Sequence, residues 1–341
     1  MKILFENSLL SCQGTSVAVD DYANFNREIL GNESIIMSKT QKSLSKVCNF
    51  KHSPLTIEYF DKKYKLYFYE NYNDVKDIIE KENVDMMYML TGGRVFDDGE
   101  LKNFGIKTCV HGVFKIPPHG EVFATISDWL SKEYDNKYPY VPHMINLPDI
   151  KDNLREKLNI PKDATVIGRH GSATTFNLPF AFDAVNKIVK ERDDIYFVFL
   201  NTNKDCEISR NYRLLEHERI IHLPVTFDVI EKTKFINTCD AMLHARVNGE
   251  SFGISPGEFS IKNKPVITWT AKDYRNIYRY KPDNAHIEIL GEKGIYYDGF
   301  SDLYEILKNF YPQPEKDWDA YSEIYNPKSV MEKFKKVFID K

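Results

Sequence analysis

The sequence predicts an α/β protein built from two Rossmann-like domains, each with a parallel sheet. Short β-rich runs alternate with amphipathic helical segments, and this alternation is typical of β-α-β units and parallel sheets. The pattern occurs twice along the chain. The length of 341 residues also suits two domains of roughly 150 residues better than one core.

The first half opens with a strand at 3–5 and a helix at 17–30, joined by a loop of small residues at 11–16. The other elements expected in this half are strands at 55–59, 65–69, 84–90, 106–110 and 122–126 and a helix at 73–82. A short basic link joins the strands at 55–59 and 65–69, and we interpret this pair as a hairpin inserted in the first domain.

A proline-rich segment at 138–149 marks the domain boundary. Its three prolines deny backbone donors to a helix or a central strand. We therefore expect an N-terminal domain at 1–145 and a C-terminal domain at 146–315. Apolar residues at helical spacing near the end of the chain predict a further helix in 316–341 that crosses back to the N-terminal domain.

The second half shows the cleaner alternation. Strands are expected at 164–168, 195–200, 219–223, 241–244 and 265–268, and helices at 151–158, 177–191, 227–238 and 254–262. No G-x-G-x-x-G follows the strand at 2–5 or that at 164–168. This absence disfavours a dinucleotide-binding enzyme.

Composition and charge narrow the class of protein. The chain is 42% hydrophobic and 28% charged, as in an ordinary globular protein. The formal net charge of -4 gives no attraction to nucleic acid, whose binders usually show a basic excess. Five widely spaced cysteines without a C-x-x-C pair favour the reducing cytoplasm. No stretch approaches the roughly 20 apolar residues that cross a bilayer. We therefore expect a cytoplasmic protein that, if its substrate is lipid-linked, contacts the membrane peripherally and does not span it.

The stretch from Cys239 to Ile267 is the most informative part of the sequence. It reads as a strand, a glycine-containing loop, a helix and a proline-led strand. The unpaired N–H groups of such a loop and helix start, together with the helix dipole, suit a diphosphate. Glu258 falls in the first turns of the helix, near the sheet edge where open α/β folds bind ligands. Its carboxylate suits a pair of ribose hydroxyls.

This stretch resembles the E-x7-E signature of retaining GT-B glycosyltransferases, especially family 4, with Glu250 and Glu258 as the two acids. The strand Pro265-Val266-Ile267 matches a flanking position of that signature. The resemblance implies a GT-B fold of two facing Rossmann-like domains, with Glu250 near the donor sugar and Glu258 holding the ribose. The donor diphosphate would accept hydrogen bonds from the backbone N–H groups of Ser251, Phe252, Gly253 and Ile254.

A second match is Gly168-Arg169, which ends a strand ahead of a loop and a helix. The resemblance implies that Arg169 is a charge-assisted partner of the donor phosphates, a role its forked donors suit. Family members usually have a Lys a few residues later, but this chain has Ser172-Ala173-Thr174-Thr175 there. Either the hydroxyl and N–H groups of this loop, Ser172 among them, replace the Lys, or the diphosphate is bound differently.

Weaker matches lie in the first half. His111 ends an expected strand where family members have a histidine facing the donor, and Gly14-Thr15 falls where they keep a glycine-rich turn near the phosphates. The segments 124–129 and 141–146 are similar to the family's strand-Ser-helix step and its Pro-led linker. These matches follow the family's order over roughly residues 1–300.

The resemblance implies a glycosyltransferase that moves a sugar, with retention, from a nucleotide-sugar donor to a glycan, a glycolipid or another hydroxyl acceptor. Glu250, His111 and Arg169 would be catalytic, since stabilising the departing diphosphate is the main requirement. No Asp-x-Asp motif is committed to the phosphates, so we expect no metal and no cofactor, and we interpret Asp97-Asp98 as a solvated turn. A nucleotide-sugar epimerase of the same architecture and a non-catalytic nucleotide- or sugar-binding protein stay open as alternatives.

Each of these residues also has an ordinary structural interpretation. His111 suits a hydrogen-bonded core, Glu258 the positive end of a helix dipole, and Gly14 a tight turn. Arg169 suits an ion pair with a surface acid. The segment 39–65 holds seven lysines against two acids, which indicates a solvated face or, with a lipid-linked acceptor, a peripheral contact with anionic headgroups.

Overall fold

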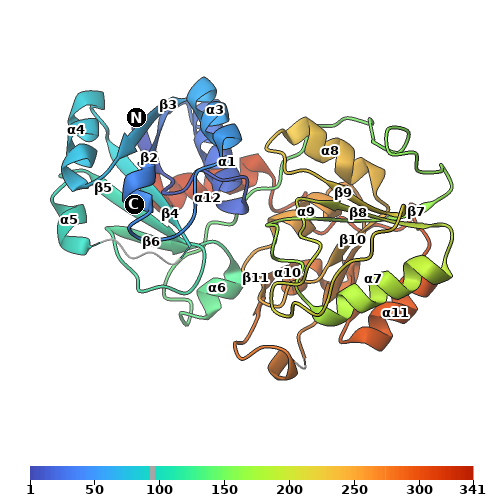
Figure 1. Ribbon diagram of the computed structural model, residues 1–341. Helices are drawn as coiled ribbons and strands as arrows, with labels where there is room; N and C mark the ends of the chain where they lie inside the picture. The colour runs from blue at the N-terminus through green and yellow to red at the C-terminus, as the bar shows by residue number, and fades with distance from the viewer. Residues whose placement is uncertain (93–96, 273, 341) are drawn as a thin grey trace. The chain divides into compact units, whose positions relative to one another are not determined.

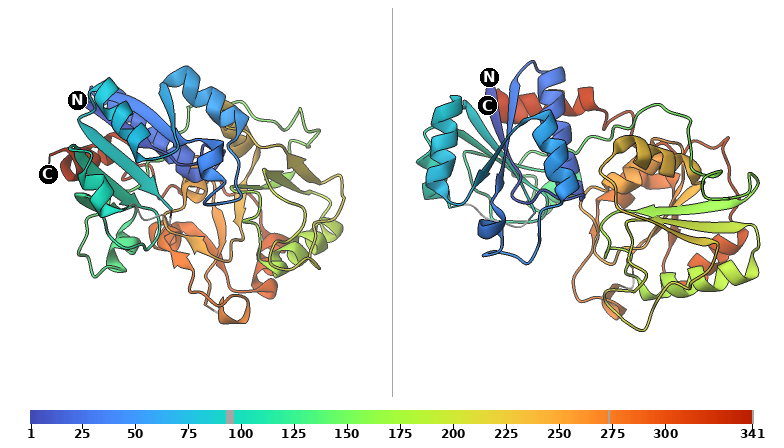
Figure 2. Two further views of the ribbon diagram at one scale, coloured as in Figure 1. Left: turned by 60° about the vertical axis from the view of Figure 1, so that its left-hand side comes forward. Right: turned by 45° about the horizontal axis from the view of Figure 1, so that its top comes forward.

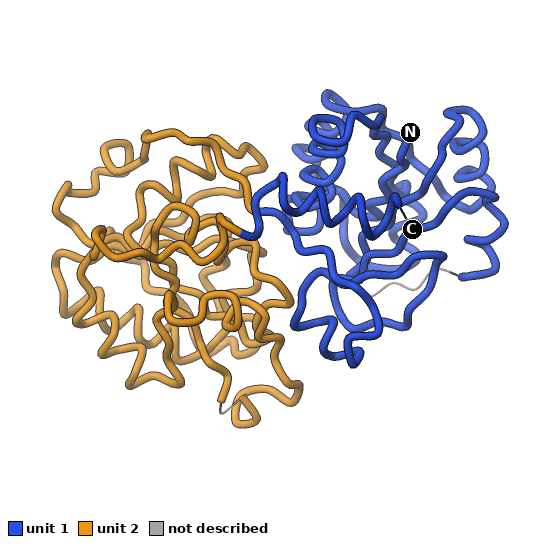
Figure 3. The backbone as a smooth tube through the Cα atoms, turned by 180° about the vertical axis from the view of Figure 1, so that it is seen from behind, with its two compact units in different colours: residues 1–144, 324–341 blue, residues 145–323 orange. Residues whose placement is uncertain are grey.

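The computed structural model describes residues 1–92, 97–272 and 274–340 and divides into two compact units (Figure 1 and Figure 3). Unit 1 contains Met1–Met144 and Ile324–Lys341, and unit 2 contains Ile145–Glu323. The chain therefore returns to unit 1 at residue 324, later than the 316 expected from the sequence.

Unit 1 is a six-stranded parallel sheet covered by helices. Its strands are β1 (Lys2–Glu6), β2 (Glu33–Lys39), β3 (Lys65–Tyr69), β4 (Met86–Thr91), β5 (Lys107–Gly112) and β6 (Val122–Thr125). Its helices are α1 (Gly14–Glu28), α2 (Gln41–Leu44), α3 (Pro54–Lys63), α4 (Tyr72–Glu82), α5 (Asp98–Lys102), α6 (Asp128–Lys132) and α12 (Pro327–Phe334). The strand order is β3-β2-β1-β4-β5-β6.

The residues of β1 show how the sheet of unit 1 is covered on both faces. Leu4 packs with the residues of α4 and α5 in one buried cluster. Phe5 points to the other face, where its ring centroid lies 5.3 Å from that of Tyr88. On that face α1 contacts α12, and the ring of Phe334 stacks on Tyr22 with centroids 5.4 Å apart. The apolar residues at helical spacing near the end of the chain thus form part of this core.

The expected hairpin in unit 1 is wrong. Residues 54–63 form α3, and the strand at 65–69 pairs in parallel with β2, which the sequence analysis did not identify as a strand. Pro54 occupies the first turn of α3, where its fixed φ favours a helix and its missing N–H costs nothing. Thr56 and Phe60, four residues apart, are the buried positions of the helix, a spacing typical of a helix rather than a strand.

Unit 2 repeats this architecture. Its main strands are β7 (Thr165–His170), β8 (Ile195–Leu200), β9 (Ile220–Leu223), β10 (Ala241–His244), β12 (Val266–Trp269) and β14 (Gly294–Tyr297), in the order β14-β12-β10-β7-β8-β9. The short strands β11 (Gly249–Glu250) and β13 (Asp283–Asn284) form a separate parallel pair. Its helices are α7 (Pro179–Glu191), α8 (Val229–Thr238), α9 (Ile254–Ser260), α10 (Ala285–Leu290) and α11 (Phe300–Asn309). Helices α7 and α11 lie side by side on one face of this sheet (Figure 2).

In unit 2 one expected helix is wrong, and β14 and α11 were not expected. The helix expected at 151–158 is a series of turns. Arg155 holds this segment, because its guanidinium donates to Ala164 O at 2.8 Å and to Asp240 Oδ2 at 2.8 Å. The sequence analysis also missed β14 and α11, although Leu303 and Leu307 are buried at helical spacing.

The strand order places a ligand-binding edge in each unit. In both sheets the first strand lies in the middle, the next two strands extend to one side, and the fourth returns to the other side. The order therefore reverses between β1 and β4 in unit 1 and between β7 and β10 in unit 2. Open α/β sheets bind ligands at the carboxyl ends of such strands. The predicted fold class, an α/β protein with two Rossmann-like parallel sheets, is confirmed.

No helix within residues 1–92, 97–272 and 274–340 is long and apolar enough to cross a membrane.

Candidate functional site

The carboxyl ends of β7 and β10, where the strand order of unit 2 reverses, carry most of its buried charge. Arg169 and His170 end β7, and His244 ends β10. The loop after β10 leads through β11 into α9, which contains Glu258. Two carboxylates, the buried Glu258 and the half-buried Glu250, thus belong to the same edge and form the two clusters described next.

Glu258 lies in an ion-pair cluster drawn from three elements. Its side chain is 4% exposed; Oε1 accepts a hydrogen bond from Lys232 Nζ on α8, and Oε2 lies 3.0 Å from His170 Nε2. Burial alone raises the pKa of the carboxyl, but Lys232 and His170 outweigh burial and lower it to about 2. Oε2 has no hydrogen bond with suitable geometry in the described part of the chain. Glu258 is therefore an ionised carboxylate held between Lys232 and His170.

Glu250 lies in a second cluster, on β11. Its Oε2 accepts a hydrogen bond from Arg246 Nη1 at 2.8 Å, and its Oε1 lies 3.2 Å from His244 Nε2. Burial opposes ionisation, yet these neighbours hold the pKa of Glu250 well below its usual range. Gly249 makes this turn possible: its φ is +62°, and a Cβ there would lie 1.9 Å from Asp283 O.

A chain of hydrogen bonds extends from Glu250 into the core. A carboxylate only accepts, so His244 Nε2 donates to Glu250 Oε1, and His244 Nδ1 lies within hydrogen-bond distance of Thr268 Oγ1, at 2.9 Å. Thr268 Oγ1 also lies 3.0 Å from His286 Nε2, so its hydroxyl joins the two rings. Burial and the nearby His244 lower the pKa of His286 to about 3, so its ring is neutral. The chain orients the ring of His244 that faces Glu250.

Arg169 holds loops of its own unit. Its Nη1 donates to Asn201 O at 3.2 Å and to Thr202 Oγ1 at 2.6 Å, and its Nη2 donates to Ser172 O at 2.8 Å and to Thr175 Oγ1 at 2.6 Å. The residue is 4% exposed, and burial lowers the pKa of its guanidinium to about 9. Ser172 thus contributes its carbonyl to Arg169.

The loop 251–254 is packed against the end of unit 2. Ser251 and Phe252 are buried, and Phe252 O accepts a hydrogen bond from Tyr321 Oη at 3.2 Å. Gly253 has a φ of +94°, and a Cβ there would lie 2.9 Å from His286 Cβ. Ile254 begins α9. The loop therefore lies between Glu250 and Glu258 and touches the residue that ends the histidine chain.

The site residues predicted in the first half belong to unit 1. His111 is fully buried; its Nδ1 accepts from Tyr88 Oη at 2.6 Å, and its Nε2 donates to Thr125 O at 3.1 Å. This is the geometry of a hydrogen-bonded core histidine. Gly14 and Thr15 open α1, and the N-cap residue before them provides no side-chain cap. The pair expected as a solvated turn is instead the exposed start of a helix: Asp97 caps α5, and Asp98, its first residue, accepts from Gly120 N.

Sequence reasoning missed several residues of the two clusters. Lys232, His170 and His244 contact the two acids, and Thr268 and His286 complete the chain behind them. His170 and His244 end strands next to the reversal of strand order, and that position was the signal that could have identified them. No group of three His, Cys, Asp or Glu residues that could hold a metal ion occurs in the described ranges.

Comparisons with known proteins identify the architecture. No family model and no curated protein matches the sequence. A glycosyltransferase from Rickettsia africae ESF-5 matches with a TM-score of 0.65 at 15% identity, over 100% of this chain and 99% of that one. Anabaena HepE in complex with UDP and glucose matches with a TM-score of 0.67 at 12% identity, over 98% of each chain. The fold is GT-B.

A putative UDP-N-acetylglucosamine 2-epimerase from Listeria monocytogenes is also similar, with a TM-score of 0.58 at 14% identity over 100% of this chain and 97% of that one. The GT-B fold is therefore shared by proteins described as transferases and as an epimerase. At these identities the likeness establishes the GT-B fold, and the chemistry must be argued from the site.

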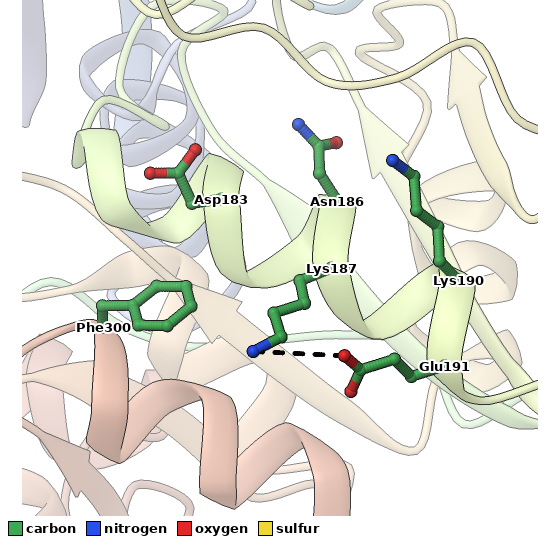
Figure 4. Close-up of a pocket in the computed structure, with 6 residues that line it drawn as sticks. All are labelled: Asp183, Asn186, Lys187, Lys190, Glu191 and Phe300. Carbon is green, nitrogen blue, oxygen red and sulfur yellow. Dashed lines mark ion pairs between the residues drawn. The ribbon is translucent and has the colours of Figure 1, made fainter.

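A surface hollow of about 530 Å³ lies elsewhere on unit 2, between α7 and the start of α11 (Figure 4). Lys187 and Glu191 face each other there at 4.0 Å. Asn186 uses both ends of its amide, donating to Arg213 O and accepting from Leu215 N. None of the residues that line this hollow contacts Glu250 or Glu258 through a described interaction, so we do not assign it to the candidate site.

Proposed function

We propose that this chain is a glycosyltransferase that transfers a sugar from a nucleotide-sugar donor to a hydroxyl acceptor. The observation that carries the proposal is the position of two ionised carboxylates, Glu250 and Glu258, at the edge where the strand order of unit 2 reverses. That edge is where an open α/β sheet binds a nucleotide. Anabaena HepE, which has a similar fold, is described in complex with UDP and glucose, which supports a nucleotide-sugar as donor.

In this proposal each acid has a separate task. Glu258 accepts hydrogen bonds from the ribose hydroxyls, and the lowered pKa that keeps its carboxyl ionised supports this role. Glu250 approaches the donor sugar, and the loop 251–254 offers backbone N–H groups to the diphosphate. These tasks follow the E-x7-E resemblance of the sequence. We further propose family 4-type chemistry, in which the product retains the anomeric configuration of the donor and no metal is required.

Turnover with a panel of UDP-, GDP-, ADP- and CDP-sugars tests the proposal. Release of the nucleoside diphosphate in the presence of sugar acceptors is the measurement. We expect one donor class to be consumed, and Glu250→Gln to lower the rate by about 100-fold, as removal of a charge that stabilises a transition state typically does. Glu218→Gln, an exposed position in the same unit, is the matched control and should leave the rate unchanged.

An epimerase is the second candidate, because the similar Listeria protein is described as one. An epimerase would change the sugar of the donor without an acceptor, and a transferase would not. Product analysis by NMR in the absence of acceptor separates the two. Tight binding of a nucleoside diphosphate without any turnover would instead support a non-catalytic binding protein.

We also propose that the acceptor is lipid-linked and that unit 1 touches the membrane, through a narrower surface than the segment 39–65. Several lysines of that segment are engaged inside unit 1: Lys63 pairs with Asp20 and Lys65 with Glu82. The loop between α2 and α3, by contrast, exposes Val47 and Phe50 by 59% and 63%, and Leu55 follows at 52%. Apolar side chains exposed beside lysines suit an anionic membrane surface.

Liposome sedimentation tests the membrane contact. We expect the full chain to sediment with vesicles of anionic phospholipid at low salt and to be released by salt. Phe50→Ser should weaken sedimentation several-fold, because it removes the most exposed apolar side chain of this loop. Tyr311→Ser, which changes a residue of unit 2 that is 61% exposed, is the control. Equal sedimentation of both variants would contradict the assignment of this loop.

A further inference from the structure

The proposed donor carries a negatively charged diphosphate, and the residue that binds it must be identified. A nucleoside diphosphate needs cationic donors, and the sequence offers Arg169 but no Lys in the following loop. All four hydrogen bonds described for the terminal nitrogens of Arg169 go to oxygens of its own unit. Binding a phosphate there would require breaking these bonds. Another cation at this edge is therefore better placed to bind the diphosphate.

Arg246 differs from Arg169 in each of these respects. Its side chain is 22% exposed, and its one described hydrogen bond joins Nη1 to Glu250. Nε is buried without a partner, and Nη2 makes no hydrogen bond with any described residue. Nε and Nη2 lie along one edge of the planar guanidinium and form a fork of two parallel donors, a geometry that matches two oxygens of a phosphate.

The loop that carries Arg246 is held in place on both sides of it. Asn177 donates its backbone N–H to Ala245 O at 2.9 Å and accepts at Oδ1 from Val247 N at 2.9 Å. The neighbouring Glu250 keeps the guanidinium charged, because it raises the pKa of Arg246. A charged fork on a fixed loop binds an anion with little loss of conformational freedom.

Lys232 is a third cation of this edge. Its Nζ donates to Glu258, and its side chain is 16% exposed. Because Lys232 offsets much of the cost of burying the charge of Glu258, it is committed to that carboxylate. Among the described cations at the carboxyl ends of β7 and β10, Arg246 thus retains the most unused donors.

We propose that Arg246, and not Arg169, supplies the guanidinium that binds the donor diphosphate. Nε and Nη2 hold two phosphate oxygens while Nη1 stays on Glu250, so that Arg246 links the leaving group to the carboxylate near the sugar. Arg169 instead positions the loop after β7. This assignment rests on the proposed function, and it explains why the chain can dispense with a Lys in that loop.

Calorimetric titration of the full chain with UDP, GDP, ADP, CDP and inorganic pyrophosphate tests this assignment. The variants are Arg246→Lys, which keeps the charge and removes the fork, and Arg169→Lys, with Arg210→Lys as an exposed control in unit 2. For the nucleoside diphosphate that binds the native chain, Arg246→Lys should weaken affinity about tenfold or more, as loss of a charge-assisted fork does. Binding of the matching nucleoside without phosphates should change less than about threefold.

The results for Arg169→Lys and for the native chain show whether the role of Arg246 or the proposed function itself is wrong. Arg169→Lys should lower the melting temperature while the folded fraction keeps its affinity for the diphosphate within about threefold. Native affinity in Arg246→Lys, with the loss confined to Arg169→Lys, would overturn the assignment and leave the proposed function intact. If the native chain bound none of the diphosphates, the proposed function itself would fail.

Discussion

The two units have the same strand order but differ at the edge where that order reverses. In unit 2 this edge holds Glu250 and Glu258 with their cationic partners. In unit 1 the acid at the corresponding edge, Glu6 at the end of β1, instead accepts a hydrogen bond from the hydroxyl of Tyr69 at 2.7 Å. Asn7 follows it and donates to Ser16 Oγ, and His111 bonds Tyr88 and Thr125. The comparison teaches that the sheet creates a position for a ligand, whereas side chains at the strand ends decide the chemistry.

Loss of Glu258 should give the largest effect on stability. Glu258→Ala leaves Lys232 and His170 buried without their carboxylate, and breaking such a pair costs about 3–5 kcal/mol. Urea unfolding at pH 7 measures this cost. The double variant Glu258→Leu with Lys232→Met should recover part of it, because no unpaired charge remains. An additive double variant would show that the two residues are not coupled.

Protonation of Glu258 should also make unit 2 less stable at acid pH. The pKa of Glu258 is lowered from 4.5 to about 2 in the folded chain. The unfolded chain therefore binds a proton first as pH falls, so the stabilisation is complete above about pH 4.5 and is lost between pH 4.5 and 2. Lys232→Met should shift this loss toward higher pH in urea unfolding experiments.

His111 predicts acid sensitivity at a higher pH for unit 1. Burial lowers its pKa from 6.5 to about 4, so in this range the unfolded chain binds the proton and the folded chain does not. Stability should fall by about 2 kcal/mol as the pH drops from 6.5 to 4.5. His111→Gln should be less stable at pH 7 but should lose less over this interval. An unchanged pH dependence in the variant would contradict the assignment of this proton uptake to His111.

Thr268 should have a smaller effect, confined to the histidine chain of unit 2. Thr268→Val keeps the shape of the side chain but removes the hydroxyl that joins His244 to His286. We expect a loss of about 1–3 kcal/mol, because two buried ring nitrogens lose their partner. Thr268→Ser should restore most of the stability. If both variants behave alike, the hydroxyl is not the feature that matters.

Much of the fold was predictable from the sequence, because alternation of strands and helices depends on local patterns. The strand at 241–244, the glycine loop and the helix from 254 were identified in this way. The partners of the acids were not, since Lys232 lies 26 residues from Glu258 in the sequence and meets it only through the packing of α8. Arg169 was assigned to the correct strand end, but its four oxygen partners come from loops whose conformation no motif specifies.

Substitution of Lys187 should have the smallest effect on stability and turnover. It compares the outer face of α7 with the carboxyl ends of β7 and β10 in the same unit. Lys187 lies over the ring of Tyr304 at 4.1 Å, on the outer side of α7 at the hollow in Figure 4, and pairs with Glu191. An exposed ion pair of this kind contributes less than about 1 kcal/mol. Lys187→Met should therefore leave both the melting temperature and the rate of donor turnover nearly unchanged. A tenfold loss of turnover without a loss of stability would show that the outer face of α7 takes part in the reaction, and the site could then no longer be confined to the carboxyl ends of β7 and β10.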